Sequence, residues 1–278
     1  MNGFLTILRL TVHEASRRRI LLAALLGGVA FLALYGTGFY FVGRQMQHQP
    51  VVSLLERRMA LNLLLLAGLF AVDLLGVMAA VLLPADTLSG EIASGVLQTV
   101  ASKPVRRSAI LLGKWAAFVL LVTAYLLLLA GGVLVIGRSL GGFLPPNAGT
   151  GLALMVLEGA LLVTMVIACG TRFGTITNGM IVLGLHGLAF VGNWVEQIGT
   201  FVGNDAARSV GTIASLIMPS ESLWQLAASR MQPTVMRELH MGPFSPASVP
   251  SPAMVVWAVG YLLVALLLAL HTFRRRPL

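Results

Sequence analysis

The sequence predicts an all-α integral membrane protein with six transmembrane helices and both termini in the cytoplasm. Its 278 residues are 57% hydrophobic and only 10% charged, with a mean hydropathy of +0.89. Soluble domains carry about 25% charged residues, so water alone cannot solvate this chain. Several uncharged runs are also long enough for a helix to cross the hydrocarbon core of a bilayer.

We expect one transmembrane domain over residues 1–278. Pro145 and Pro146 should keep the fourth span from starting before about Gly149, and Ser251-Pro252 is a typical start for the sixth. In the long connection at about 195–251, Ser220 could cap a short helix that lies at the outer interface and carries Leu223, Trp224 and Leu226. The expected spans cover about 20–42, 60–84, 109–137, 149–171, 174–194 and 252–273.

The distribution of basic residues sets the orientation. With the N-terminus inside, the inner segments hold 12 of the 19 Lys and Arg residues, and the longer outer segments hold 7. This bias predicts N-in and C-in, and it accounts for the net charge of +9 without a nucleic-acid partner. Residues 1–19 are not a span. Phe4, Leu5, Leu8 and Val12 recur at helical spacing, which predicts an amphipathic helix on the inner membrane surface.

A cytoplasmic helix is predicted between the second and third spans. Leu88, Ile92, Val96 and Val100 recur every four residues and make one apolar stripe. Asp86 is a plausible N-cap, and Pro104 stops the helix. Periodicity leaves two interpretations open: an interfacial helix that only closes a loop, or a docking element for a cytosolic partner.

The same stretch resembles the signature loop of ABC-2-type transporter permeases. In that family a Ser or Thr precedes a Glu by two residues, a Gly follows four residues later, then Ser/Thr-x-Pro, a basic residue and aliphatic-aliphatic-Gly-Lys. This chain has Ser89, Glu91, Gly95, Ser102, Pro104, Arg107, Ile110, Leu111, Leu112, Gly113 and Lys114. The run His13–Arg19 and the six-span layout are also similar to the family. Val96, where the family often has Thr, and the long outer segment are departures.

The resemblance implies a permease subunit of an ATP-driven exporter in the plasma (inner) membrane of a prokaryote. A second copy or a paralogue would pair with it, and cytosolic ATPase subunits would bind ATP and Mg²⁺. Leu88, Glu91, Ile92, Gly95 and Pro104 would then form the coupling element. A carboxylate at Glu91 suits this role because it can pair with Arg or Lys across a partly desolvated contact.

This chain is not expected to hydrolyse ATP or to hold a cofactor itself. A phosphate-binding loop needs Gly-x-x-x-x-Gly-Lys-Ser/Thr. The only Gly-Lys is Gly113-Lys114, which Trp115 follows, and Ser108 stands where the first Gly belongs. The His-Glu-x-x-His motif of zinc proteases is also absent from the sequence, because His13-Glu14 continues with Ala-Ser-Arg.

Two acids, Asp73 and Glu158, fall at membrane depth and are candidates for the translocation path. They also support an alternative function, a carrier driven by an ion gradient, although internal repeats typical of such carriers are absent. A buried, protonated structural acid is equally compatible with either position. A membrane anchor without transport activity is a further alternative.

The remaining polar residues predict structure more than chemistry. We interpret Asn62, Asn178 and His186 as packed polar groups between helices. The outer cluster of Met231, Met236, His240 and Met241 could bind Cu(I), but we interpret it as an ordinary loop and predict no metal site. The single cysteine, Cys169, excludes an internal disulfide.

Overall fold

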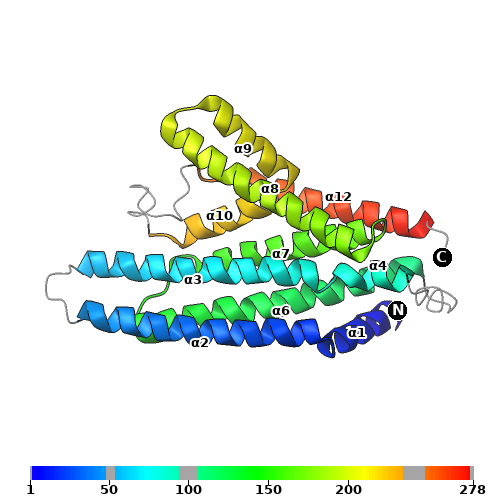
Figure 1. The fold of residues 1–278 in the computed structure, drawn as a ribbon, viewed down its shortest axis with the longest axis horizontal. Helices are drawn as coiled ribbons and strands as arrows, with labels where there is room; N and C mark the ends of the chain where they lie inside the picture. The colour runs from blue at the N-terminus through cyan, green and yellow to red at the C-terminus, as the bar shows by residue number, and fades with distance from the viewer. Residues whose placement is uncertain (1, 48–53, 94–105, 234–247, 276–278) are drawn as a thin grey trace.

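The fold is a bundle of helices, seen in a computed structural model that describes residues 2–47, 54–93, 106–233 and 248–275 (Figure 1). Six helices within these ranges are long and apolar enough to cross a membrane, which confirms the predicted fold class. They are α2 (Arg19–Gln47), α3 (Leu54–Leu82), α6 (Arg107–Gly141), α7 (Ala148–Gly170), α8 (Thr175–Val202) and α12 (Ala253–Arg275). The shorter helices are α1 (Asn2–Ser16), α4 (Ala85–Ala93), α9 (Asp205–Ile217) and α10 (Ser220–Met231).

Helix α7 lies at the centre of the bundle and packs against α3, α6, α10 and α12. Its composition explains this position, because Glu158 is the only charged residue in its 23 residues. Leu161, Leu162 and Val163 on α7 are fully buried. In contrast, α2 and α12 expose many apolar side chains, as expected for helices that face lipid.

The chain ends lie at the same end of the bundle, beside α1 and α4 (Figure 1). An even number of spans requires this arrangement. The side of the membrane that this end faces stays a prediction from the charge distribution, which assigns it to the cytoplasm. We refer to it below as the basic end.

Helix α1 exists as predicted, and its neighbour is the start of α6. The two helices meet at Gly113, where a Cβ atom would lie 2.9 Å from Ile7 Cβ and 3.1 Å from the Phe4 carbonyl oxygen. The buried edge of α1 runs through Ile7, Thr11 and Ala15. This edge differs from the predicted stripe, because contact with α6 selects it.

The connection after α8 differs most from the prediction. Helix α8 continues to Val202, and the chain turns at Gly203, whose φ of 74° favours glycine. Asn204 then caps α9 by accepting hydrogen bonds from the N–H groups of Ala206 and Ala207 at 3.0 and 3.2 Å. Helix α9 returns along α8 as an antiparallel hairpin (Figure 1).

The short helix predicted around Leu223 is present as α10, but its predicted interfacial position is wrong. Every α10 residue except Arg230 is buried. Trp224 is 3% exposed, and its ring centroid lies 5.7 Å from that of Phe70 on α3. The predicted cap is also wrong, because Pro219 occupies the N-cap position and Ser220 begins the helix. The hairpin of α8 and α9 brings the chain back into the bundle.

Candidate functional site

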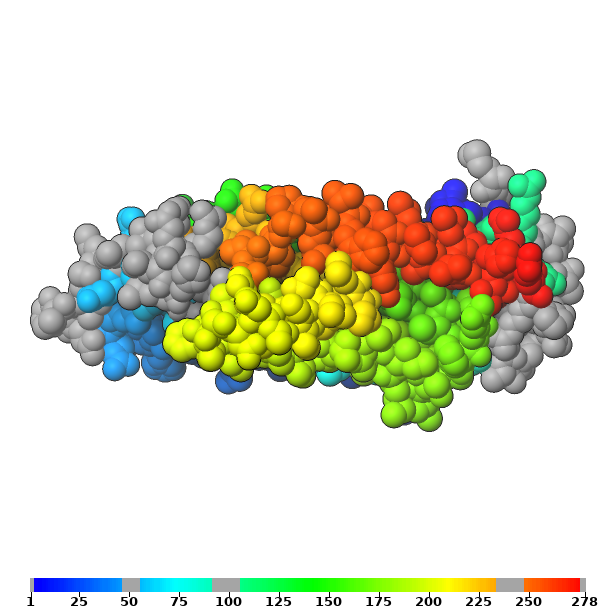
Figure 2. Space-filling model, turned by 90° about the horizontal axis from the view of Figure 1, so that it is seen from above, coloured from blue at the N-terminus to red at the C-terminus, as the bar shows by residue number. Residues whose placement is uncertain are grey.

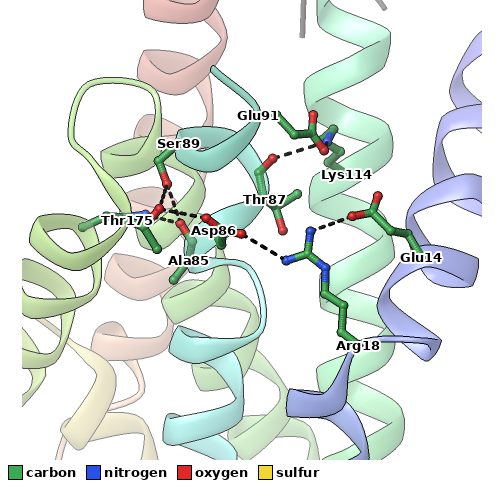
Figure 3. A network of polar contacts seen from close by, with 10 residues as sticks. Glu14, Arg18, Ala85, Asp86, Thr87, Ser89, Glu91, Lys114 and Thr175 are labelled. Carbon is green, nitrogen blue, oxygen red and sulfur yellow. Dashed lines mark hydrogen bonds and ion pairs between the residues drawn. The ribbon is translucent and has the colours of Figure 1, made fainter. Parts of the chain in front are cut away.

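Helix α4 is attached to three other parts of the bundle at the basic end (Figure 3). Its buried residues include Thr87, Leu88 and Ser89. Polar contacts join α4 to the turn after α1, to α6 and to α8. Helix α4 is therefore held between three elements of the bundle.

The contact with α6 is an ion pair between Glu91 and Lys114. The side chains are 15% and 7% exposed, respectively, so the pair is largely shielded from solvent. Lys114 Nζ also donates to the carbonyl oxygen of Thr87 at 3.4 Å. The cation expected to meet Glu91 from a partner protein is therefore present within the same chain.

The contact with α8 joins the other side of α4. Thr175 Oγ1 donates to Asp86 Oδ1 at 3.0 Å and lies 2.9 Å from Ser89 Oγ. Asn178 Nδ2 donates to the carbonyl oxygen of Ala85 at 3.4 Å, which confirms the predicted interhelical role of Asn178. Ser89 of the motif therefore contacts α8 directly.

The third contact comes from the turn between α1 and α2. Arg18 Nη2 donates to Glu14 Oε1 at 2.6 Å, and Arg18 Nη1 lies 3.6 Å from Asp86 Oδ2 (Figure 3). The Asp86 side chain is 55% exposed, so this bridge is weaker than the Glu91–Lys114 pair. It nevertheless places the basic run after α1 beside α4.

The structure places part of the predicted coupling element. Leu88 is buried at the α7–α8 turn, where its Cβ approaches Gly170, and Glu91 points to α6. Ile92 belongs to α4. Gly95 and Pro104 lie outside the described residues.

A second polar site lies inside the bundle and contains three carboxyl groups from three helices. Asp73 of α3, Glu158 of α7 and Glu221 of α10 are 4%, 1% and 5% exposed, respectively. Asp73 and Glu158 interact through their side chains, and the charge of Asp73 also acts on Glu221. The structure therefore brings the two predicted acids together and adds a third.

No described Lys or Arg forms an ion pair with these three carboxyl groups. Within the part of the chain that the structure describes, neither oxygen of Glu158 has a well-formed hydrogen bond, whereas Glu221 Oε1 accepts from Asn193 Nδ2 at 3.2 Å. Burial, followed by the charge of Asp73, raises the pKa of Glu221 to about 8. Because buried carboxylates in contact do not all ionise, this cluster must hold protons.

Glu221 is the residue that sequence reasoning missed. It follows Ser220 and precedes Ser222 in a segment predicted to lie outside the bundle, so it resembled an exposed helix start. His186, predicted as a packed polar residue, contacts Ser220, the residue before Glu221, and its Nδ1 lies 2.9 Å from Ser220 Oγ. Asn62 Nδ2 donates to the Met231 carbonyl oxygen at 3.3 Å, which confirms its interhelical role.

Among the described residues, no group of three or more His, Cys, Asp or Glu side chains is arranged to hold a metal ion. Of the Met and His cluster, Met231 is buried in α10, and Met236, His240 and Met241 lie outside the described ranges. Comparison with models of known protein families finds no match for this chain, and comparison with curated proteins finds none either.

Proposed function

We propose that this chain is the membrane-spanning permease subunit of an ATP-driven ABC exporter in the inner membrane of a prokaryote. The observation that carries the proposal is the attachment of α4 to α6 and α8 through Ser89, Glu91 and Lys114 of the ABC-2-like motif. Asp86 of α4 adds a contact with Arg18 in the turn after α1. A second copy or a paralogue would complete the membrane pathway. ATP and Mg²⁺ would bind to a separate cytosolic subunit.

The contacts of α4 support a role in transmitting movement from an ATPase to α6 and α8. An ATPase that closes against the basic end would displace α4, and the buried Glu91–Lys114 pair would carry this displacement to α6. The contacts of Thr175 and Asn178 with α4 would carry it to α8 at the same time. Helices α6 and α8 lead from this end into the bundle, so both would move in response to nucleotide.

Substitution of Glu91 tests the proposal. We expect Glu91→Ala and Glu91→Arg to weaken ATPase association and transport while the chain still inserts into the membrane. The matched control exchanges the two charges, Glu91→Lys with Lys114→Glu, which retains an ion pair. Recovery of association by this exchange would locate the role of Glu91 within the chain, and no recovery would indicate direct contact with the ATPase. Normal transport and association in Glu91→Arg would contradict coupling through α4.

A carrier driven by an ion gradient is the second candidate function. The buried acids Asp73, Glu158 and Glu221, which form no ion pair with a described Lys or Arg, favour it, because buried carboxyl groups that hold protons can also exchange them. The discriminating experiment uses the purified chain alone in liposomes with an imposed proton gradient. Transport that Asp73→Asn or Glu158→Gln abolishes would establish the carrier, and transport that requires an added ATPase and ATP would exclude it.

A further inference from the structure

A groove at the basic end lies between the α7–α8 turn and the last two turns of α12. Its outer part has a volume of about 420 Å³ and is lined by Arg172, His271, Thr272 and Arg275, together with Thr171. In Figure 2 the red end of α12 lies beside the green segment in which α7 is followed by α8. A cavity of this size is within the range that holds small ligands and headgroups.

Toward the middle of α12 the lining of the groove becomes mostly apolar, and we call this part the apolar channel. A second cavity of about 250 Å³ shares Thr171, Arg172 and Thr272 with the first, so the two are adjacent. Cys169, Phe173 and Leu268 are among its apolar lining residues. Along α12 the lining changes from Leu268 to Arg275, which are about 10 Å apart in a helix. The groove is therefore amphipathic along the direction of the membrane normal.

The charge at the mouth of the groove is not compensated within the described residues. Arg172 and Arg275 are exposed, and neither takes part in an ion pair there. None of the described residues that line the two cavities is acidic. Arg107 Nη1 donates to the carbonyl oxygen of Arg274 at 3.2 Å, which adds another guanidinium group beside the end of α12. The mouth therefore favours an anion.

We propose that this groove binds one anionic phospholipid from the leaflet at the basic end. Arg172 and Arg275 would hold the headgroup phosphate, because guanidinium groups form strong charge-assisted hydrogen bonds with phosphate. An acyl chain would lie against Phe173 and Leu268. Basic pockets between helices on the cytoplasmic side are suited to such headgroups, and the apolar channel is what distinguishes this site from ordinary surface arginines.

The position of the groove links the lipid to α4. Thr175, three residues after Arg172, donates to Asp86 of α4. A lipid that joins the α7–α8 turn to α12 would stabilise the segment on which α4 rests. The inference requires only that the chain spans a membrane, so it is independent of the ATP-driven function.

The test uses the only cysteine in the sequence, Cys169, as a reporter inside the channel. The rate of its modification by an apolar maleimide is measured for the full chain in detergent. Phosphatidylglycerol and phosphatidylcholine with identical acyl chains are added in separate titrations, and soluble glycerol phosphate is added in a third. We expect phosphatidylglycerol to slow the modification at concentrations about tenfold lower than phosphatidylcholine requires, and glycerol phosphate to have no effect.

Two matched variants locate the effect. Arg172→Gln with Arg275→Gln should remove the preference for phosphatidylglycerol. Arg138→Gln with Arg230→Gln, which removes the same charge from exposed positions away from the groove, should retain it. Native mass spectrometry of the unmodified protein should show one retained phosphatidylglycerol, and this measurement needs no variant if the first pair alters the fold.

Three results would overturn the proposal. Equal protection by both lipids would mean that the channel accepts acyl chains without regard to charge. Protection by glycerol phosphate would mean that the mouth binds small anions instead of a lipid. A preference that persists without Arg172 and Arg275 would place the lipid elsewhere.

Discussion

The two sets of buried charges in this protein are built in opposite ways. At the basic end, Glu91 has a cation, Lys114, as its direct partner. Inside the bundle, the partners of Asp73, Glu158 and Glu221 among the described residues are one another and neutral groups such as Asn193. The first arrangement is stabilised by the attraction between opposite charges, whereas the second is stable only when some of its carboxyl groups are protonated. Substitutions that neutralise a side chain should therefore reduce stability at the basic end and be tolerated inside the bundle.

The largest effect is expected from Lys114→Ala. It leaves the carboxylate of Glu91 without its partner in a shielded position, and such a loss costs about 3 kcal/mol. The free energy of unfolding in detergent, measured by denaturant titration, gives the value. Glu91→Gln with Lys114→Met removes both charges and should recover most of the loss. If Lys114→Ala is as stable as the wild type, the Glu91–Lys114 pair is not important for stability.

The carboxyl cluster should make stability depend on pH. The pKa of Glu221 is about 8 in the folded protein against an ordinary value of 4.5, so between these values the folded state binds more protons than the unfolded state. Stability should therefore fall as pH rises through this window, by roughly 2 kcal/mol between pH 6 and pH 8. Glu221→Gln should remove that part of the slope, and its amide oxygen can still accept from Asn193. An unchanged slope would assign the protons to other groups.

Close packing at the basic end can be tested at Gly113. A methyl group there would meet Ile7 and the Phe4 backbone, so Gly113→Ala should displace α1 and cost about 1 kcal/mol. Gly131→Ala on the same helix is the control, because a Cβ at that position meets nothing within 4 Å. Limited proteolysis of α1 reports the displacement. Equal behaviour of the two variants would mean that α1 adjusts without loss.

The smallest effect is expected from Asp73→Asn. Because the cluster already holds protons, replacing one acid by its neutral analogue should change the free energy of unfolding by less than about 1 kcal/mol. ATP-driven transport should also remain unchanged across pH, in which case Asp73 is structural. A transport defect that varies with pH would instead support the carrier.

The contrast between the two regions also explains what the sequence could predict. The membrane spans could be predicted because a helix that crosses lipid needs a long apolar run. The roles of Asn62 and Asn178 could be predicted because polar side chains in a helix bundle need hydrogen-bond partners on other helices. The Glu91–Lys114 pair joins residues 23 positions apart that only the three-dimensional packing relates. Glu221 reaches the bundle interior because α9 turns back along α8, and no local pattern around Ser220 signals that return.

The central claim is that a separate ATPase acts on this chain through α4. The most direct measurement is purification of the wild-type protein from native membranes in mild detergent, with mass spectrometry of every chain that accompanies it. We expect to recover a soluble chain with a Walker A motif in stoichiometric amount. Repeated recovery of this protein without such a chain, together with transport driven by a proton gradient alone, would contradict it.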